Sequence, residues 1–234
     1  WRRRGGGAFV ESVHAFSLNY EALRRSQLRP GSLRVVNQAL LGQALAELAD
    51  PPVQAFFVMS SNPAVSCPDA ERLRRALLRD DLFTVVHDTF LTETAELADI
   101  VLPACTALEH EDLFRSYGQL YMQYVRPAIP PLGQARSNAW LVRELAARLG
   151  LDDPVFRRSD EELVQELVQD PQLARRLLAG ERVKVTPTGG PGRWPTPSGR
   201  IRFDPALDFV PDHARDPELA RQRARYPLRL LSAP

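Results

Sequence analysis

Two short apolar runs in the first half of the chain each lead into side chains that could hold a polar ligand. The run at residues 55–59 is followed by Asn62, and the run at 82–86 is followed by His87 and Asp88. An amide offers both a hydrogen-bond donor and an acceptor, whereas an ionised carboxylate only accepts. A carboxylate matches the paired N–H donors of a guanine edge, or a ribose diol, so this combination indicates a nucleotide site.

The apolar pattern predicts a scaffold that would bring these side chains together. Short buried strands are predicted at 55–59, 82–86 and 99–102, each bounded by turn residues. A helix that has Pro68 just inside its start, and a shorter helix at 92–97, lie between them. This alternation predicts an α/β fold, a Rossmann-like parallel sheet with flanking helices and right-handed crossovers. Ligands bind outside the carboxyl ends of such strands, where the polar residues fall.

One further feature supports the nucleotide interpretation, while others support a purely structural one. In support of a nucleotide, the helix predicted to begin near Thr92 would point free N–H groups at the same sheet edge, which favours phosphate. However, neither GxGxxG nor GxxxxGK[ST] occurs in the chain. From spacing alone, Asn62 can be turn chemistry before a proline and Asp88 a helix cap. A single His87 is more often a satisfied strand-end side chain than a ligand contact.

Outside this region the pattern predicts a further helix before the sheet and a small irregular α+β extension after it. Proline-rich residues 125–138 indicate a surface segment. A Ser or Asn cap and a following Gly bound one helix, and a capping box starts another. The predicted elements are helices at 33–48, 139–149 and 160–169, a hairpin of residues 182–188 with 199–203, and a charged linker at 204–225.

Composition excludes several classes of protein. With 30 basic and 29 acidic residues the formal charge is +1, so no strong field attracts nucleic acid or a membrane surface. Cys67 and Cys105 are the only cysteines and form no CxxC motif, which excludes a zinc ribbon or an iron–sulfur site within the chain. No apolar run approaches the ~20 residues that span a bilayer. The chain opens without Met, so we expect residues upstream to be missing.

One long stretch carries a family resemblance. Asn62-Pro63, then D-x-F-x-T-x-T-A-x-x-A-D-I-V-L-P from Asp88, then E-H-E-D from Glu109 occur in that order. This series resembles the molybdopterin oxidoreductase superfamily, of the dimethyl sulfoxide reductase type that carries bis-molybdopterin guanine dinucleotide. The likeness continues through YMQYVRPAIPPLGQARSNAWLVRELAARLG and TPSGRIRF, and is strongest over 50–150. YPLRLLSAP resembles the first strand of that family's C-terminal dinucleotide-binding barrel, so we expect the chain to be truncated there.

The resemblance implies cofactor-binding roles for six positions. The expected contacts to one guanine dinucleotide, its phosphates or the pterin side are Asn62, His87, Asp88, Thr92, His110 and Asn138. Asn138 carries an amide where some relatives use a carboxylate. Thr92 and Asn138 can also be read as helix caps, and Glu109 and Glu111 as solvated surface acids. No catalytic residue and no metal ligand is expected within the chain, because the family's metal-ligating side chain and its iron–sulfur cysteines lie upstream.

The function implied is that of a cofactor-binding segment of a molybdenum-dependent oxidoreductase, inactive alone and cytoplasmic. Expected partners are the missing N- and C-terminal domains, an electron-transfer subunit and a small-molecule substrate. The expected domains are a dinucleotide-binding domain at 1–150, an extension at 151–225 and a barrel strand at 226–234. Two alternatives stay open: a cofactor-free scaffold domain of a respiratory NADH dehydrogenase-type subunit, and a Rossmann-like enzyme for another nucleotide, such as a thiamine-diphosphate type.

Overall fold

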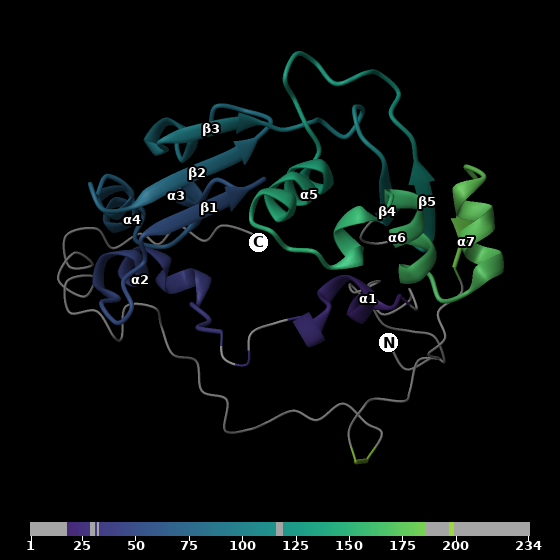
Figure 1. Ribbon diagram of the computed structural model, residues 1–234, viewed down its shortest axis with the longest axis horizontal. Coiled ribbons are helices and arrows are strands. Elements are labelled where there is room, and N and C mark those ends of the chain that lie inside the picture. Colours follow the sequence, from purple (N-terminus) through teal and green to yellow (C-terminus); the bar gives the residue numbers. More distant parts are fainter. Residues whose placement is uncertain (1–17, 29–30, 32, 116–118, 186–196, 199–234) are drawn as a thin grey trace, which may run out of the picture. The chain divides into compact units, whose positions relative to one another are not determined.

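A three-stranded parallel sheet occupies the first half of the chain in the computed structural model, which describes residues 18–28, 31, 33–115, 119–185 and 197–198 (Figure 1). The strands are β1 (Ala55–Met59), β2 (Phe83–Asp88) and β3 (Ile100–Pro103), in the spatial order β1-β2-β3. Both neighbouring pairs are parallel. The predicted α/β fold with a parallel sheet is therefore confirmed.

Strand β2 is longer than predicted. His87 pairs with Met59 on β1 and with Leu102 on β3, and Asp88 pairs with Pro103. The Asp88 carbonyl also accepts a hydrogen bond from the Ala104 amide at 2.9 Å. His87 and Asp88 are thus the last two residues of the strand, and not the start of the loop after it.

The helices around this sheet are shorter than the apolar pattern predicts. The helix expected at 33–48 is a 3-10 turn, η3 (Gln38–Leu40), followed by α2 (Leu41–Glu47), because the Asn37 side chain caps the chain at the Ala39 amide. The helix expected at Pro68 is α4 (Ala70–Leu77), whose N-cap is Asp69. Pro68 therefore lies just outside the helix. A further short helix, α3 (Pro63–Ser66), was not predicted.

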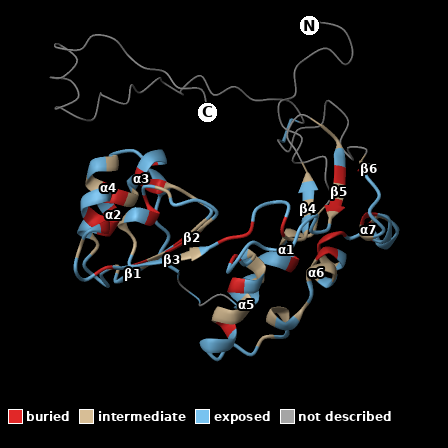
Figure 2. Cartoon of the chain, turned by 90° about the horizontal axis from the view of Figure 1, so that it is seen from above, coloured by how far each residue is buried: buried red, intermediate tan, exposed pale blue. Residues whose placement is uncertain are grey.

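The helices pack against one face of the parallel sheet (Figure 2). Two clusters of buried side chains join them to the strands: Leu45, Ala64, Cys67, Leu73, Ala76, Leu77 and Leu82 in one, and Val58, Val86 and Ala95 in the other. Helices α2 and α4 approach so closely that a Cβ on Gly42 would lie 3.0 Å from the Leu73 amide nitrogen. Glycine at this position is what permits the contact.

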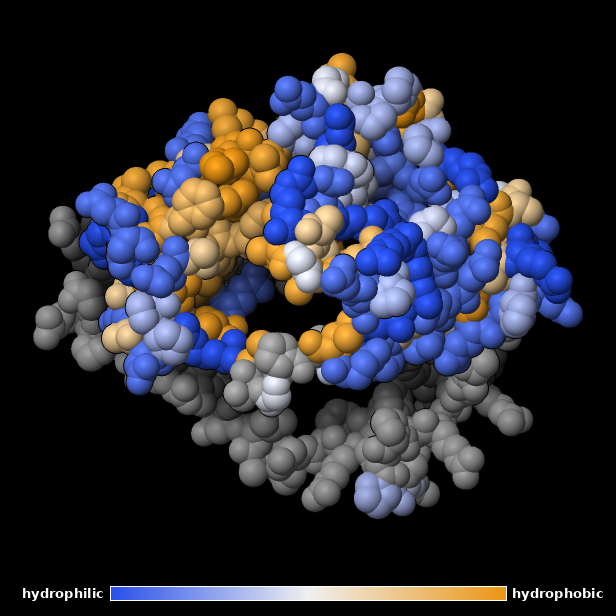
Figure 3. Space-filling view, viewed as in Figure 1, coloured by the Kyte–Doolittle hydropathy of each residue, from blue (hydrophilic) through white to orange (hydrophobic). Residues whose placement is uncertain are grey.

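The opposite face of the sheet keeps large apolar side chains at the surface. The strand register places Phe57, Phe83 and Ile100 on this face, and they are 39%, 49% and 43% exposed. Figure 3 shows hydrophobic side chains gathered over these strands. Parallel sheets are usually covered on both faces, so this surface is unusual for a parallel sheet.

A second, antiparallel sheet follows the first in sequence. It is built from β4 (Asp112–Arg115), β5 (Tyr121–Val125) and β6 (Val183–Lys184), in the order β4-β5-β6. Strands β4 and β5 were not predicted. Residues 183–184 pair with β5, and residues 199–203, the predicted hairpin partner of this strand, lie outside the described residues, so the hairpin stays a prediction.

One face of this second sheet packs on α6 (Asp160–Leu167) and α7 (Pro171–Leu178). The shared core is Met122, Tyr124, Val164, Val168, Ala174, Leu177 and Val183. Helix α6 begins with the predicted capping box between Ser159 and Glu162, and α7, which was not predicted, begins at a cap made by Asp170. The register of β4 and β5 is set by which side chains reach this core.

The remaining elements are short. Helix α1 (Tyr20–Arg24) and the turn η2 (Ser26–Leu28) precede the sheet, and η5 (Pro154–Arg157) precedes α6. Helix α5 (Asn138–Arg148) starts at the Ser137 cap as predicted and is followed by Gly150 with a φ of +69°. The chain divides into two compact units at residues 188 and 189, and nearly all of the second lies outside the described residues, as does the strand expected at 226–234. Within the described ranges no helix is long and apolar enough to span a membrane.

Candidate functional site

The carboxyl edge of the parallel sheet is organised around Ser60, the first residue after β1. Its amide donates to the His87 carbonyl at 2.9 Å, and its Oγ accepts a hydrogen bond from Asn138 Nδ2 at 3.3 Å. The backbone φ of Ser60 is +48°, a left-handed conformation that side chains other than glycine adopt at a cost. This one residue therefore joins the ends of β1 and β2 to the start of α5.

Asn62 is held by the loop that follows β2. Its Oδ1 accepts hydrogen bonds from the Thr94 amide at 3.3 Å and the Thr94 hydroxyl at 2.8 Å, and its Nδ2 donates to Glu93 at 2.7 Å. The buried Thr94 hydroxyl in turn accepts from the Ala64 amide at 3.0 Å. The bond from Asn62 lowers the pKa of the Glu93 carboxyl. Asn62 thus fixes the turn after β1 to the loop after β2.

Thr92 caps a single turn and does not open a true helix. The element expected at 92–97 is the 3-10 turn η4 (Ala95–Leu97), and the Thr92 hydroxyl accepts from the Ala95 amide at 3.2 Å. The Thr94 amide is already bound to Asn62. The expected phosphate site at a helix N-terminus is therefore wrong, because the N–H groups in question are taken by side chains of the chain itself.

Asp88 keeps half of its carboxylate available. Oδ1 accepts from the Phe90 amide at 3.1 Å and from the Thr89 hydroxyl at 3.4 Å, while Oδ2 has no hydrogen-bond donor among the described residues. Phe90 and Leu91, which follow directly, expose most of their side chains. The carboxylate is therefore oriented by its own loop and presents one oxygen beside an exposed aromatic ring.

His87 is buried without any hydrogen bond from its ring. The residue is 1% exposed, and neither Nδ1 nor Nε2 has a partner in the described structure. An imidazole carries at least one N–H donor, and an unpaired buried polar group of this kind costs about 1–3 kcal/mol. The structural alternative for His87, a satisfied strand-end histidine, is therefore not what the structure shows, and the ring is a buried donor and acceptor without a partner among the described residues.

His110 lies apart from this hydrogen-bonded group, in the turn that follows β3. Its Nδ1 is 2.9 Å from the Glu111 carbonyl oxygen, and no hydrogen bond links it to the other five predicted residues. The neighbouring Glu109 is only 5% exposed and accepts from the Thr106 amide and hydroxyl and from the Leu132 amide. These bonds lower its pKa.

Reading Glu109 as a solvated surface acid was therefore wrong, because its carboxylate joins two loops. Glu111 likewise accepts a hydrogen bond from the buried Tyr124 hydroxyl, so it is not a free surface acid either.

Five of the six predicted residues thus meet at one edge of the sheet: Asn62, His87, Asp88, Thr92 and Asn138. Sequence reasoning missed three residues that position them, namely Ser60, Glu93 and Thr94. A hydroxyl directly after a strand, and a second threonine two residues after Thr92, were the only signals. Neither signal distinguishes a positioning residue from a solvated one without the fold.

Comparison with known proteins places this edge in a family context. The chain is 40% identical over 216 residues to the probable oxidoreductase YoaE of Bacillus subtilis, which covers 87% of this chain and 31% of that protein. It is 32% identical to the F420-dependent formate dehydrogenase subunit alpha of Methanocaldococcus jannaschii, over 63% of this chain and 21% of that protein. The chain spans less than a third of the length of these relatives.

A solved structure shares the fold as well. Acetylene hydratase from Pelobacter acetylenicus matches with a TM-score of 0.59 and 25% identity, over 80% of this chain and 28% of that one. The family model for molybdopterin oxidoreductase matches residues 3–148, which include the parallel sheet and all six predicted site residues. The chain therefore belongs to the molybdopterin oxidoreductase family.

Proposed function

We propose that this chain is the segment of a molybdenum-dependent oxidoreductase that holds one guanine dinucleotide arm of a molybdopterin cofactor. The observation that carries the proposal is the polar carboxyl end of β2. Asp88 presents a half-free carboxylate there, and the preceding His87, whose side chain lies on the other face of the strand, is buried with no ring partner among the described residues. Ligands of α/β proteins bind at this edge. Family membership supports the cofactor class.

The residues at the edge fit such a group unequally. Asp88 Oδ2 can accept an N–H donor of a guanine edge, and His87 carries a buried donor and acceptor without partners among the described residues. Asn138 donates to Ser60 and retains its Oδ1 as an acceptor. The Thr92 oxygen already accepts one bond, so its hydroxyl hydrogen is what remains. The donor and acceptor set is therefore suited to the polar end of a nucleotide.

Asn62 has a different role in this proposal. Both ends of its amide are bound to the loop at Glu93 and Thr94, which leaves one N–H for a ligand. Asn62 would mainly shape the cradle, while Asp88 and His87 make the contacts. His110 remains a candidate for a contact on the pterin or phosphate side, because its Nε2 is not used within the described chain.

The bound cofactor would supply two-electron redox chemistry at molybdenum, with oxygen-atom or hydride-equivalent transfer. The share of this chain is to bind and orient one arm. Hydrogen bonds to charged groups contribute about 1.5–3 kcal/mol each, so a few of them suffice to retain the nucleotide end. Within the same proposal residues 1–150 form the dinucleotide-binding domain, and residues 151–225 an extension to it.

The test is Asp88→Ala in the purified protein. The control is Asp152→Ala, because that carboxylate lies at the surface and, within the described part of the chain, pairs only with Arg157. Bound molybdenum is measured by mass spectrometry, and guanine nucleotide is measured after acid release. Losing one charge-assisted hydrogen bond should weaken retention about tenfold or more. Molybdenum and guanine contents that match the control, in a variant with an unchanged circular dichroism spectrum, would remove Asp88 from the site.

One observation favours a second candidate, a scaffold domain without cofactor. Asn62 and Thr92 both make hydrogen bonds that stabilise the fold whether or not a ligand binds. A scaffold has no use for the unpaired His87 ring, however, which leaves the cofactor-binding function better supported. A protein that purifies with neither molybdenum nor guanine nucleotide, after expression in a host that makes the cofactor, would favour the scaffold.

A further inference from the structure

The open face of the parallel sheet is apolar along all three strands. Side chains alternate along each strand, and the register places Phe57, Phe83, Val85 and Ile100 on the side away from α2, α3 and α4. β1 and β3 contribute no charged side chain to this face. A contiguous apolar surface of this kind marks a place where another element packs.

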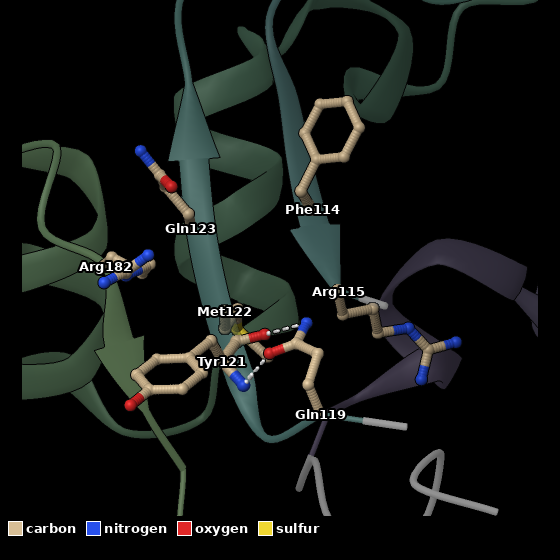
Figure 4. Close-up of a pocket in the computed structure, with 7 residues that line it drawn as sticks. All are labelled: Phe114, Arg115, Gln119, Tyr121, Met122, Gln123 and Arg182. Atoms are coloured by element: carbon tan, nitrogen blue, oxygen red, sulfur yellow. Dashed lines mark hydrogen bonds between the residues drawn. The ribbon is translucent and has the colours of Figure 1, made fainter. Parts of the chain in front are cut away.

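The second sheet shows what a solvent-facing sheet surface looks like in the same chain. Figure 4 shows Tyr121 and Gln123 on β5 and Phe114 on β4, with the Arg182 guanidinium 5.1 Å from the centre of the Tyr121 ring. Lys184 on β6 is directly opposite Tyr121. This outward face mixes aromatic, amide and cationic groups, and an antiparallel sheet commonly leaves one face to water. The open face of the parallel sheet lacks this mixture.

The outer edge of β1 is open as well. β1 comes first in the order β1-β2-β3, and within the described ranges it pairs with β2 alone. Free edges commonly carry a lysine, a proline or a bulge that prevents further pairing, whereas β1 reads Ala-Phe-Phe-Val-Met. The strand at the other end differs, since β3 ends at Pro103 and the next residue, Ala104, bridges to Arg136. β1 is therefore built like an internal strand.

The direction of the crossovers explains why one face has no helix. The chain passes from β1 to β2 and then to β3, so it moves across the sheet in one direction. Right-handed crossovers in one direction place their connecting segments on one face. Accordingly, α4 and η4 both lie on the side that buries Leu73 and Ala95. By the same rule, crossovers that cover the opposite face run toward strands beyond β1.

Relatives of this chain contain enough further sequence for such strands. The matched region is 31% of the probable oxidoreductase YoaE and 28% of the acetylene hydratase chain. More than two thirds of each of those proteins therefore lies outside the match. A βαβ unit takes about 30 residues or more, so several units fit within that length.

We propose that strand–helix units of the same polypeptide, from outside these 234 residues, pair with the free edge of β1 and cover the open face of the parallel sheet. One addition completes both surfaces, because the strand bonds to the β1 backbone and its helix packs on Phe57, Phe83 and Ile100. A second copy packed face to face would bury these side chains but leave the β1 edge unpaired. The proposal does not depend on whether a cofactor binds, so it can fail while the proposed function stands.

The test is photo-crosslinking in the full-length polypeptide that contains this chain. Phe57→p-benzoylphenylalanine and Phe83→p-benzoylphenylalanine place a benzophenone on the open face, at positions that already carry a ring. The control is Leu78→p-benzoylphenylalanine, because Leu78 is 65% exposed at the C-cap of α4, which packs on the other face. Isotope-labelled and unlabelled proteins are mixed before irradiation, and crosslinked peptides are identified by mass spectrometry. Both ring positions should crosslink within one molecule to peptides outside residues 1–234, and the control should form none of these crosslinks.

Hydrogen exchange in the unmodified full-length protein tests the edge of β1 independently. The amides of a parallel strand point alternately to its two neighbours. If β1 is paired on both sides, every amide from Phe56 to Met59 should exchange about a hundredfold or more slowly than an unstructured amide. A free edge would protect only the alternate amides that bond to β2.

Four results would overturn the proposal. Crosslinks from Phe57 and Phe83 that stay within residues 1–234 would mean that the chain covers its own sheet. Crosslinks that join labelled to unlabelled molecules, or reach a different protein, would identify a separate partner. Yields no higher than at Leu78 would show that the face is open to solvent, and fast exchange at alternate β1 amides would show that the edge stays free.

Discussion

Two buried threonines of the parallel-sheet region allow a sharp test of the hydrogen-bond network at the candidate site. Thr94 and Thr84 are both 0% exposed, but their hydroxyls differ completely. The Thr94 hydroxyl donates to Asn62 Oδ1 at 2.8 Å and accepts from the buried Ala64 amide at 3.0 Å. The Thr84 hydroxyl is buried with no partner in the described structure. Valine matches threonine in shape, so each substitution changes only the polar group.

The magnitudes follow from this contrast. Thr94→Val leaves the Ala64 N–H buried without an acceptor and removes one hydrogen bond to Asn62, so we expect a loss of about 2–3 kcal/mol in the free energy of unfolding. Thr84→Val replaces an unsatisfied hydroxyl with a methyl group, and should gain about 1–2 kcal/mol. The two variants should therefore differ by roughly 3–5 kcal/mol, which is about 6–20 °C in Tm at this chain length.

The assay is urea denaturation followed by circular dichroism, together with thermal melts of both variants and the wild type. The midpoints should move in opposite directions while the slope with urea concentration stays constant. Equal shifts in the same direction would refute the reasoning, because they would show that the hydroxyl of Thr94 contributes no more than the orphan hydroxyl of Thr84. In that case Asn62 would not be held by Thr94.

Two other predictions concern packing and pH. Gly42→Ala would place a Cβ 3.0 Å from the Leu73 nitrogen and 3.2 Å from the Leu73 Cα. Helices α2 and α4 must then separate, at a cost of about 1–3 kcal/mol in the free energy of unfolding. The control Gly31→Ala, whose Cβ would meet nothing within 4 Å, should leave the urea midpoint unchanged. Glu109 has a pKa held below its ordinary 4.5 by bonds from Thr106 and Leu132, so its stabilisation is present above pH 4.5 and is lost as the pH falls through the folded value. Urea midpoints of the wild type and Glu109→Gln should therefore differ most at neutral pH and converge in acid; a constant difference across this range would contradict the assignment.

The parallel sheet could be predicted because its signals are local and strong. Phe56, Val58 and Val86 belong to short apolar runs between turn residues, and the intervening helix carries acidic residues near its start and arginines near its end, as the helix dipole favours. The caps at Ser137 and Ser159 were equally readable, since each is a side chain next to the amides that it accepts from. These features depend on neighbours within a few residues.

The second sheet could not be predicted for a related reason. Tyr121 and Gln123 alternate with Met122 and Tyr124, but three of these four side chains carry polar atoms, so the period-two pattern is weak in hydropathy. Strand β6 has only two residues and pairs with a strand about 60 positions earlier, as in Met122 with Val183. Packing on α6 and α7 decides this sheet, and no local signal reports it.

The candidate site was predictable in residue type but not in detail. The spacing identifies Asn62, His87 and Asp88. It does not reveal that the Asn62 amide is already hydrogen-bonded to Glu93 and Thr94. It also does not reveal that the His87 ring is buried without a partner among the residues that the structure describes. Both facts depend on which loops meet after folding, and the left-handed backbone of Ser60 is likewise set by those loops.

The hydrogen bonds at the sheet edge also differ in the length of the chain loop between the two residues that each one joins. Asn62 reaches Glu93 across 31 positions, whereas Asn138 reaches Ser60 across 78. The longer closure costs about 0.8 kcal/mol more in chain entropy, from (3/2)RT ln(78/31). Contacts of small sequence separation form faster. We therefore expect the turn after β1 to be completed early in folding by residues within one continuous βαβ segment, and α5 to dock its first residue onto an edge that already exists.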